Sequence, residues 1–114
     1  MPTDLQGTTR SVLLIRAKPG CRDRLVALFS RLRVLEKASR QEGFIACEVQ
    51  IPTDDDEHVL VTALWESPDA YRGWLENPVR DEMTEELQQL TAADPEPRVY
   101  EIVQALSVST EVSP

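Results

Sequence analysis

Two aromatic side chains with polar tips, Trp65 and Tyr71, stand six residues apart in the second half of the chain. Their rings can pack against an apolar ring system, and their indole N–H and phenol O–H can each donate a hydrogen bond to an oxygen atom. Such a pair suits a site that orients an aromatic compound and stabilises negative charge on it. The alternative is that both side chains pack in a core without taking part in chemistry.

The segments around this pair predict a largely apolar pocket. Val61 and Trp65 lie four residues apart in an expected strand and therefore share one face of a sheet. Tyr71 lies one turn into the following helix and can lean back over Trp65. We expect Trp65 and Tyr71 to be the catalytic residues and the following residues to bind the substrate: Leu13, Ile15, Phe29, Leu32, Val61, Ala63, Trp74 and Met83.

Other classes of site lack their usual residues. The sequence has one histidine, His58, and two cysteines, Cys21 and Cys47, without the spacings typical of metal ligands. It also lacks a glycine-rich phosphate loop and the Gly-x-Ser-x-Gly motif of a serine nucleophile. We therefore expect no metal and no cofactor.

Charge and hydropathy narrow the list of partners. The formal net charge of -8 disfavours binding to nucleic acid or to anionic lipid. No apolar run approaches the length of a membrane span, and the polar N-terminus does not resemble a signal peptide. The sequence predicts a cytoplasmic protein with free thiols that binds a small molecule.

The elements needed to position the pair follow one order. Short apolar runs predict strands at 11–17, 44–51, 58–65 and 99–106. An apolar stripe predicts one helix over 21–41, ending near Gly43, and two Ser/Asn-Pro start signals predict helices from 67 and from 77 to 90. This βα ββ αα β order is the split βαβ pattern of an α+β, ferredoxin-like fold, with an antiparallel four-stranded sheet and helices on one face. We expect a flexible N-terminus at 1–10, one domain at 11–106 and a flexible tail at 107–114.

Both faces of the third strand are apolar. Val59, Val61, Ala63 and Trp65 point one way, whereas Leu60 and Leu64 point the other way. Helices on one side would leave an apolar sheet face exposed, and an area of several hundred Å² is unusual on a monomer. We therefore expect a homodimer that covers this face.

The segment from Trp65 to Ala70 resembles the Trp-Glu-Ser-x-x-Ala motif of the antibiotic biosynthesis monooxygenase family. The Pro19-Gly20 turn and the Glu42-Gly43-Phe44 segment are also similar, and the resemblance runs from about Ser11 to Leu106. It implies a dimeric α/β barrel with a pocket between sheet and helices. The closest similarity is to anthrone-type monooxygenases, which oxidise polycyclic aromatic polyketide intermediates with O₂ and without a cofactor. In them, a Trp and a Tyr six residues later line the pocket, as Trp65 and Tyr71 would here.

The chain departs from these relatives at polar positions. Anthrone monooxygenases have an Asn where this chain has Val61 and an Arg near the position of Thr84. Haem-degrading relatives have an Asn near Leu13 and a ligand His where this chain has Trp74, so haem binding is not expected. No general base is evident, which leaves two alternatives open: an isomerase or cyclase acting on a reactive aromatic intermediate, and a non-catalytic accessory protein that binds a small molecule.

Overall fold

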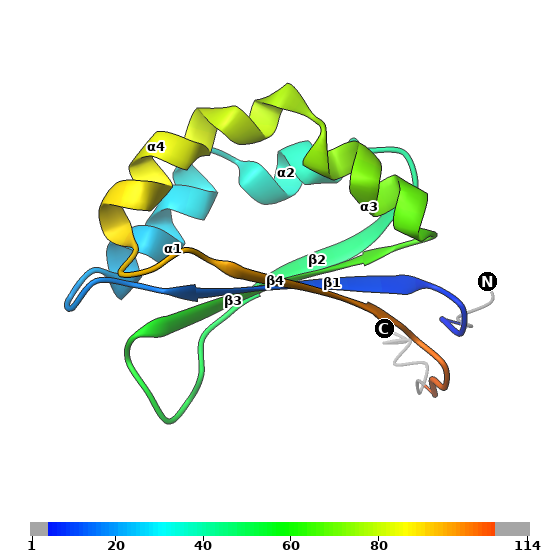
Figure 1. Cartoon of the computed structure of the whole chain (residues 1–114), viewed down its shortest axis with the longest axis horizontal. Coiled ribbons are helices and arrows are strands. Elements are labelled where there is room, and N and C mark those ends of the chain that lie inside the picture. Colours follow the sequence, from blue (N-terminus) through cyan, green and yellow to red (C-terminus); the bar gives the residue numbers. More distant parts are fainter. Residues whose placement is uncertain (1–4, 107–114) are drawn as a thin grey trace, which may run out of the picture.

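A computed structural model describes residues 5–106 of the 114-residue chain (Figure 1). Four antiparallel strands form one sheet in the order β2-β3-β1-β4. The strands are β1 (Thr9–Arg16), β2 (Phe44–Gln50), β3 (His58–Trp65) and β4 (Glu96–Glu101). This arrangement confirms the predicted ferredoxin-like α+β fold.

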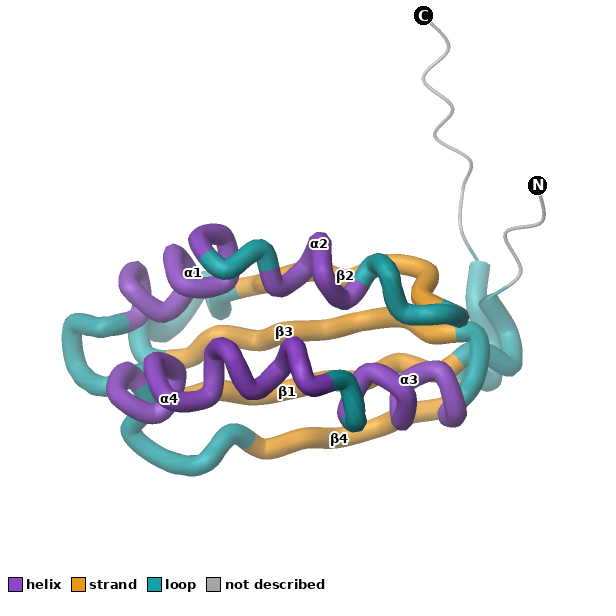
Figure 2. The backbone as a smooth tube through the Cα atoms, turned by 90° about the horizontal axis from the view of Figure 1, so that it is seen from above, coloured by secondary structure: helices purple, strands orange, loops and turns teal. Residues whose placement is uncertain are grey.

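The helices within residues 5–106 all lie on one face of the sheet (Figure 1). They are α1 (Arg22–Arg31), α2 (Val34–Ala38), α3 (Pro68–Leu75), the short 3₁₀ helix η1 (Pro78–Arg80) and α4 (Asp81–Leu90). Seen from above, α1 and α2 form one row and α4 and α3 form a second, roughly parallel row (Figure 2). The site described below lies between these helices and the sheet.

The core fills one end of this two-layer structure. Ile15 of β1 and Val59 of β3 are paired across the sheet, and both are completely buried under Leu25 and Leu28 of α1. Burial of each such side chain contributes about 1.5–3 kcal/mol to stability. This core holds α1 and α4 on the sheet. It does not fill the other end of the structure, where the site described below lies.

The predicted single helix over 21–41 is wrong, because the chain breaks at Arg33. This residue adopts a left-handed conformation with φ of 53° and separates α1 from α2. In a continuous helix Val34 would point about 180° away from Leu25, into solvent. The break instead buries Val34 and Ala38. Gly43, where the single helix was expected to end, has a positive φ of 85°, but it lies in the turn before β2 and does not cap a helix.

The predicted bounds of the outer segments also need correction. The last strand spans Glu96–Glu101, whereas 99–106 was expected, and Pro97 lies within it opposite Leu13. Proline is tolerated there because β4 is an edge strand. β1 begins at Thr9, so Thr9 and Arg10 belong to the sheet and not to a flexible N-terminus. Residues 1–4 and the predicted tail at 107–114 lie outside the described residues.

The sheet face opposite the helices is apolar along its central strands. Val12 and Leu14 of β1 lie there beside Thr62 and Leu60 of β3. The outer strands add charged neighbours, since Arg98 pairs with Val12 and Glu48 pairs with Thr62. This face is therefore an apolar stripe with polar edges, narrower than the sequence alone predicts.

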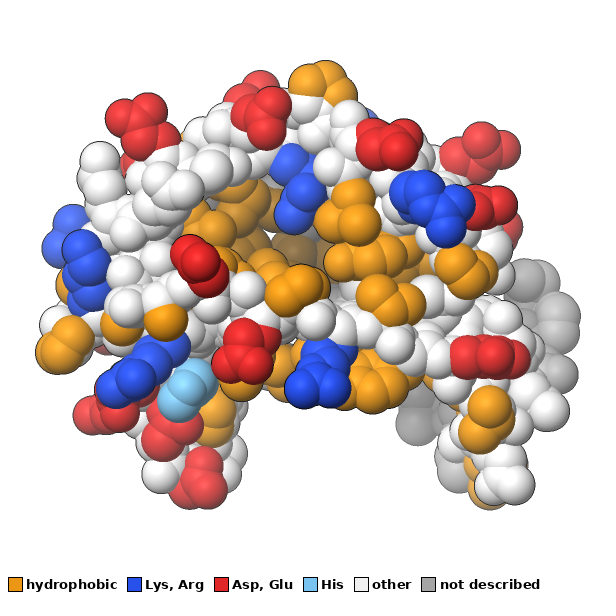
Figure 3. Space-filling view, in the orientation of Figure 1, with side chains coloured by type: hydrophobic (Ala, Val, Ile, Leu, Met, Phe, Trp, Pro, Cys, Tyr) orange, Lys and Arg blue, Asp and Glu red, His pale blue; other side chains and the backbone are white. Residues whose placement is uncertain are grey.

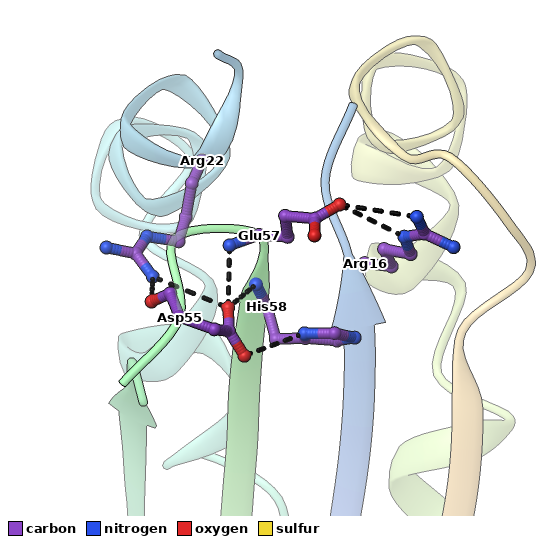
Figure 4. Close-up of polar contacts among 5 residues, drawn as sticks. All are labelled: Arg16, Arg22, Asp55, Glu57 and His58. Atoms are coloured by element: carbon purple, nitrogen blue, oxygen red, sulfur yellow. Dashed lines mark hydrogen bonds and ion pairs between the residues drawn. The ribbon is translucent and has the colours of Figure 1, made fainter. Parts of the chain in front are cut away.

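A polar network fastens the loop between β2 and β3 at the end of the sheet farthest from Trp65 (Figure 4). The Asp55 carboxylate accepts hydrogen bonds from the backbone N–H groups of Glu57 and His58, at 2.7 and 3.0 Å. Its other oxygen lies 3.0 Å from Nδ1 of His58, and Arg22 donates to the Asp55 carbonyl at 2.6 Å. His58 and the acidic loop therefore have a structural role.

Replacing Asp55 by alanine should lower stability at neutral pH and do so less in acid. The two backbone hydrogen bonds, helped by His58, hold the pKa of the Asp55 carboxyl below its usual value. A lowered pKa stabilises the fold above the unfolded pKa of about 3.9, and this contribution is lost as pH falls through the folded value. Thermal unfolding of both proteins at pH 7 and below pH 3 measures the difference. Asp54→Ala, in the same loop, is the control and should leave stability at pH 7 nearly unchanged, because the Asp54 side chain makes no hydrogen bond or ion pair within residues 5–106.

Candidate functional site

Helix caps position the side chains that follow β3. The Ser67 hydroxyl accepts a hydrogen bond from the backbone N–H of Ala70 at 3.2 Å, so α3 begins immediately after Trp65 and Glu66. The Asn77 side chain caps η1 in the same way, through the N–H of Val79 at 2.9 Å. These two caps confirm both predicted start signals and fix where Tyr71 and Arg80 stand.

Trp65 is the last residue of β3 and is completely buried. Its ring contacts Phe44 edge-on at 5.6 Å and Tyr71 at 5.9 Å with a tilt of 49°. Its indole N–H donates to the hydroxyl oxygen of Ser11, 3.0 Å away on β1. This N–H is therefore engaged within the protein, which differs from the expectation that it donates to a substrate oxygen.

Tyr71 lies on α3 with its phenol half-buried. Burial raises the pKa of this phenol above its ordinary value, and the nearby positive charge of Arg80 opposes part of that shift. The phenol therefore stays protonated at neutral pH and can act as a hydrogen-bond donor. It cannot act as a base in that state.

A cavity of about 370 Å³ lies between the sheet and the helices, next to Trp65. Figure 3 shows hydrophobic side chains gathered around a hollow on this side of the molecule. Its floor comes from the sheet and its walls come from α2, α3, η1 and α4. The lining residues are Ser11, Val12, Leu13, Val34, Leu35, Ala38, Cys47, Val61, Ala63, Trp65, Tyr71, Trp74, Leu75, Arg80, Leu87, Pro95 and Pro97.

Six of the ten predicted site residues line this cavity: Leu13, Val61, Ala63, Trp65, Tyr71 and Trp74. Ile15 and Phe29 do not, because both are packed in the core between α1 and the sheet. Leu32 and Met83 line a separate recess of about 10 Å³, which also borders Trp74. The structure thus brings the aromatic part of the predicted site together and leaves these four residues as packing around it.

Arg80 is a cavity residue that the sequence analysis missed. Its Nη1 donates to the carbonyl oxygen of Leu75 at 3.2 Å, and no ion pair involves it among residues 5–106. Glu82, two residues further, is bound to Lys37 at 2.7 Å. Arg80 lies one helical turn before Thr84, where the family resemblance implies an arginine, so a search one turn to either side would have found it.

Cys47 and Ser11 are the other polar lining residues that the sequence analysis missed. Burial, with smaller effects from Glu36 and Glu48, raises the pKa of the Cys47 thiol. The thiol is therefore protonated at neutral pH and is a poor nucleophile. Ser11 is buried and accepts the Trp65 hydrogen bond.

The polar side-chain groups of the cavity's lining residues are a guanidinium, a phenol, a serine hydroxyl, a thiol and the indole N–H groups of Trp65 and Trp74, of which that of Trp65 is bound to Ser11. None of its lining residues, all within the described range, is Asp, Glu or His. Within residues 5–106 no group of three His, Cys, Asp or Glu side chains could hold a metal ion. In the same range, no helix combines the length and apolar character needed to cross a membrane. The cavity is thus apolar, with hydrogen-bond donors and no carboxylate or imidazole base.

Comparison with known proteins gives one family. The family model for antibiotic biosynthesis monooxygenase (ABM) matches residues 10–86. A search of curated proteins finds no match.

Several solved structures share the fold. SnoaB, a cofactor-independent oxygenase from Streptomyces nogalater, is 22% identical with a TM-score of 0.73, over 88% of this chain and 97% of its own. A conserved protein from Methanosarcina mazei Go1 is 17% identical with a TM-score of 0.76, over 86% and 95%. A protein from Chloroflexus aurantiacus J-10-fl, described as a candidate antibiotic biosynthesis monooxygenase, is 25% identical with a TM-score of 0.68, over 88% and 97%.

Proposed function

Because the chain belongs to the antibiotic biosynthesis monooxygenase family, we propose that it is a cofactor-independent monooxygenase that oxidises a polycyclic aromatic, polyketide-type intermediate of specialised metabolism with O₂. The observation that carries this proposal is the cavity of about 370 Å³ lined by Trp65, Tyr71 and Trp74, with Arg80 as its single cation among the described residues. This volume falls in the range of about 300–1,000 Å³ that is usual for small-molecule sites.

The proposed reaction needs no external electron donor. An acidic CH₂ group of the substrate, conjugated through the ring system with a carbonyl, loses one proton and becomes a stabilised carbanion. The carbanion transfers one electron to O₂, and the radical pair combines to form a C–O bond and, after protonation, a hydroperoxide. Loss of water then converts the hydroperoxide carbon into a carbonyl. One oxygen atom ends in the product, the other in water, and the substrate supplies all the electrons.

The side chains fit this chemistry through binding and electrostatics. Arg80 carries a positive charge into an apolar cavity, where it would stabilise the substrate anion more strongly than in water. The protonated Tyr71 phenol can donate a hydrogen bond to the same anion. Because the cavity has no base, the proton leaves to water, and the substrate must be acidic enough to ionise when its oxygen faces Arg80.

The missing base also favours a second candidate, a binding protein without catalysis. A cavity with donors and no base can hold a carbonyl-rich aromatic compound and release it unchanged. An isomerase or cyclase is supported less well, because moving a proton between carbon atoms ordinarily uses a positioned acid or base.

Turnover of an anthrone with and without O₂ separates these functions. The proposal expects consumption of the anthrone and uptake of O₂ in air, at a rate well above the spontaneous reaction, and neither under nitrogen. Equal turnover under nitrogen, with a product of unchanged mass, would identify an isomerase or cyclase. Quenching of tryptophan fluorescence without any turnover in air would identify a binding protein.

The homodimer and the cytoplasmic location stay predictions. The apolar stripe of Val12, Leu14 and Leu60 on the face without helices supports pairing of two chains through that face. Light scattering at micromolar concentration should give twice the mass of one chain. A mass of one chain would contradict the homodimer and leave the proposed reaction standing.

A further inference from the structure

We propose that the Ser11 hydroxyl donates a hydrogen bond to an oxygen of the ligand in the cavity, and that Trp65 is a positioning residue that acts through Ser11. The inference rests on the proposed function in one respect, which is that the cavity beside Trp65 receives a ring compound bearing oxygen atoms. It concerns a residue that neither the motif nor the family resemblance indicates.

The direction of the Trp65–Ser11 hydrogen bond follows from the groups involved. An indole N–H can only donate, so over the 3.0 Å between Nε1 and Oγ the Ser11 hydroxyl must be the acceptor. Trp65 is completely buried and Ser11 is 7% exposed, so water competes little for this bond. One lone pair of Ser11 is therefore occupied, and its proton is directed elsewhere.

That proton has no acceptor in the described part of the protein. The only hydrogen bond of the Ser11 side chain among residues 5–106 is the one from Trp65. Across the sheet, Ser11 stands between Ala63 of β3 and Val99 of β4, and neither side chain can accept a hydrogen bond. Ser11 lines the cavity floor, so a ligand oxygen there is a natural acceptor for its proton.

The chemistry of the ligand follows from this arrangement. Ser11 and Tyr71 offer hydroxyl protons, and Arg80 offers N–H groups with a positive charge. All three recognise hydrogen-bond acceptors. The ligand class is therefore an aromatic ring system with carbonyl or phenolate oxygens, and Ser11 would distinguish it from a plain hydrocarbon of the same shape.

A matched pair of probes tests this inference by binding alone. Anthraquinone-2-sulfonate and anthracene-2-sulfonate share the ring shape and the sulfonate, and they differ in the two carbonyl oxygens. Binding is measured by quenching of tryptophan fluorescence, without any turnover. Ser11→Ala should lower the affinity for the quinone about tenfold, which is the usual effect of losing one hydrogen bond. It should change the affinity for the hydrocarbon by less than twofold.

Two further variants test the role of Trp65. Ser11→Thr keeps the hydroxyl and should restore most of the quinone affinity that Ser11→Ala loses, while the affinity for the hydrocarbon stays unchanged. Trp65→Phe removes the N–H and frees Ser11 to rotate, so it should weaken the quinone selectively. Adding Ser11→Ala to Trp65→Phe should then lower the quinone affinity little further, because both substitutions remove the same interaction with the ligand. Circular dichroism checks that each variant is folded, and quenching of Trp74 remains as the binding signal.

The results that would contradict the role of Ser11 differ from those that would contradict the proposed oxygenase. Equal weakening of both probes by Ser11→Ala, or no weakening of either, would overturn the assignment of Ser11 and leave the proposed oxygenase untouched. Full additivity of the two changes would overturn the role of Trp65. Failure of both probes to bind the unaltered protein would overturn the aromatic ligand site itself. If the probes bind as expected but an anthrone causes no O₂ uptake, the role of Ser11 is supported and the proposed oxygenase activity is contradicted.

Discussion

Replacing Arg80 by glutamine should reduce kcat/KM for an anthrone about a hundredfold. Arg80 is the single cation among the described cavity residues, and none of the ion pairs within residues 5–106 neutralises it. Loss of one group that stabilises developing negative charge typically costs a factor of about 10²–10³ in rate. Initial rates of O₂ uptake over a range of substrate concentrations measure the effect.

Two controls separate a specific role of Arg80 from a general effect of charge. Arg72→Gln removes an arginine on α3 that is exposed and bound to Asp69, so this change should leave kcat/KM within about twofold. Arg80→Lys keeps the positive charge but not the planar set of N–H donors. Its kcat/KM should lie between those of Arg80→Gln and the unaltered protein. A similar loss of kcat/KM in Arg72→Gln, or an unchanged kcat/KM in Arg80→Gln, would contradict a specific role of Arg80 in the site.

Replacing Gly43 by alanine should lower the free energy of unfolding by about 2–5 kcal/mol. Gly43 has φ of 85°, and a side chain in this left-handed region costs roughly 1–2 kcal/mol. Its new Cβ would also lie 2.5 Å from the Cβ of Ala70 on α3, and forcing such a contact adds roughly 1–3 kcal/mol. Urea unfolding followed by circular dichroism measures the change.

Gly20 and Ala70 provide the matched comparisons. Gly20 has a similar φ of 76° but nothing within 4 Å of its would-be Cβ, so Gly20→Ala should lower stability by the conformational part alone. Adding Ala70→Gly to Gly43→Ala removes the contact, and the double variant should lose less than the sum of the single changes. Equal losses in Gly43→Ala and Gly20→Ala would show that the contact with α3 carries no weight.

This contact also links the turn before β2 to the site. The backbone N–H of Glu66 donates to the carbonyl of Gly43 at 2.8 Å, which ties the start of α3 to the same turn. Tyr71 follows Ala70 directly, so pushing Ala70 outward would move the Tyr71 ring relative to Trp65. The glycine therefore positions one wall of the cavity.

Features set by local sequence were predicted well. The caps at Ser67 and Asn77 depend on side chains that bond to nearby backbone groups, and both appear where expected. The bounds of β3 were also correct, because its apolar run ends directly at the next helix signal. These local features suffice to place Trp65 and Tyr71 on adjoining elements.

Features set by tertiary packing were not predicted. The left-handed Arg33 is favoured by burial of Val34 and Ala38, and the local helical pattern gives no sign of it. The expected last strand, 99–106, leaves Pro97 outside the sheet, yet the edge strand β4 accommodates this proline.

The polar half of the site depends on contacts between distant segments. Ser11 and Trp65 are 54 residues apart in sequence, so their hydrogen bond became visible only in the folded chain. Arg80 stood one turn from the position that the resemblance indicated. The sequence therefore predicted the aromatic side chains of the cavity, and the structure added the groups that can hold an anion.

Labelling with ¹⁸O₂ tests the central claim most directly. The protein is incubated with an anthrone in an ¹⁸O₂ atmosphere, and the product is examined by mass spectrometry against a reaction without protein. The proposed chemistry predicts one labelled oxygen in the new carbonyl, formed faster than in the reaction without protein, and one labelled oxygen in water. A product without label, or a labelled product formed no faster than without the protein, would contradict a cofactor-independent monooxygenase.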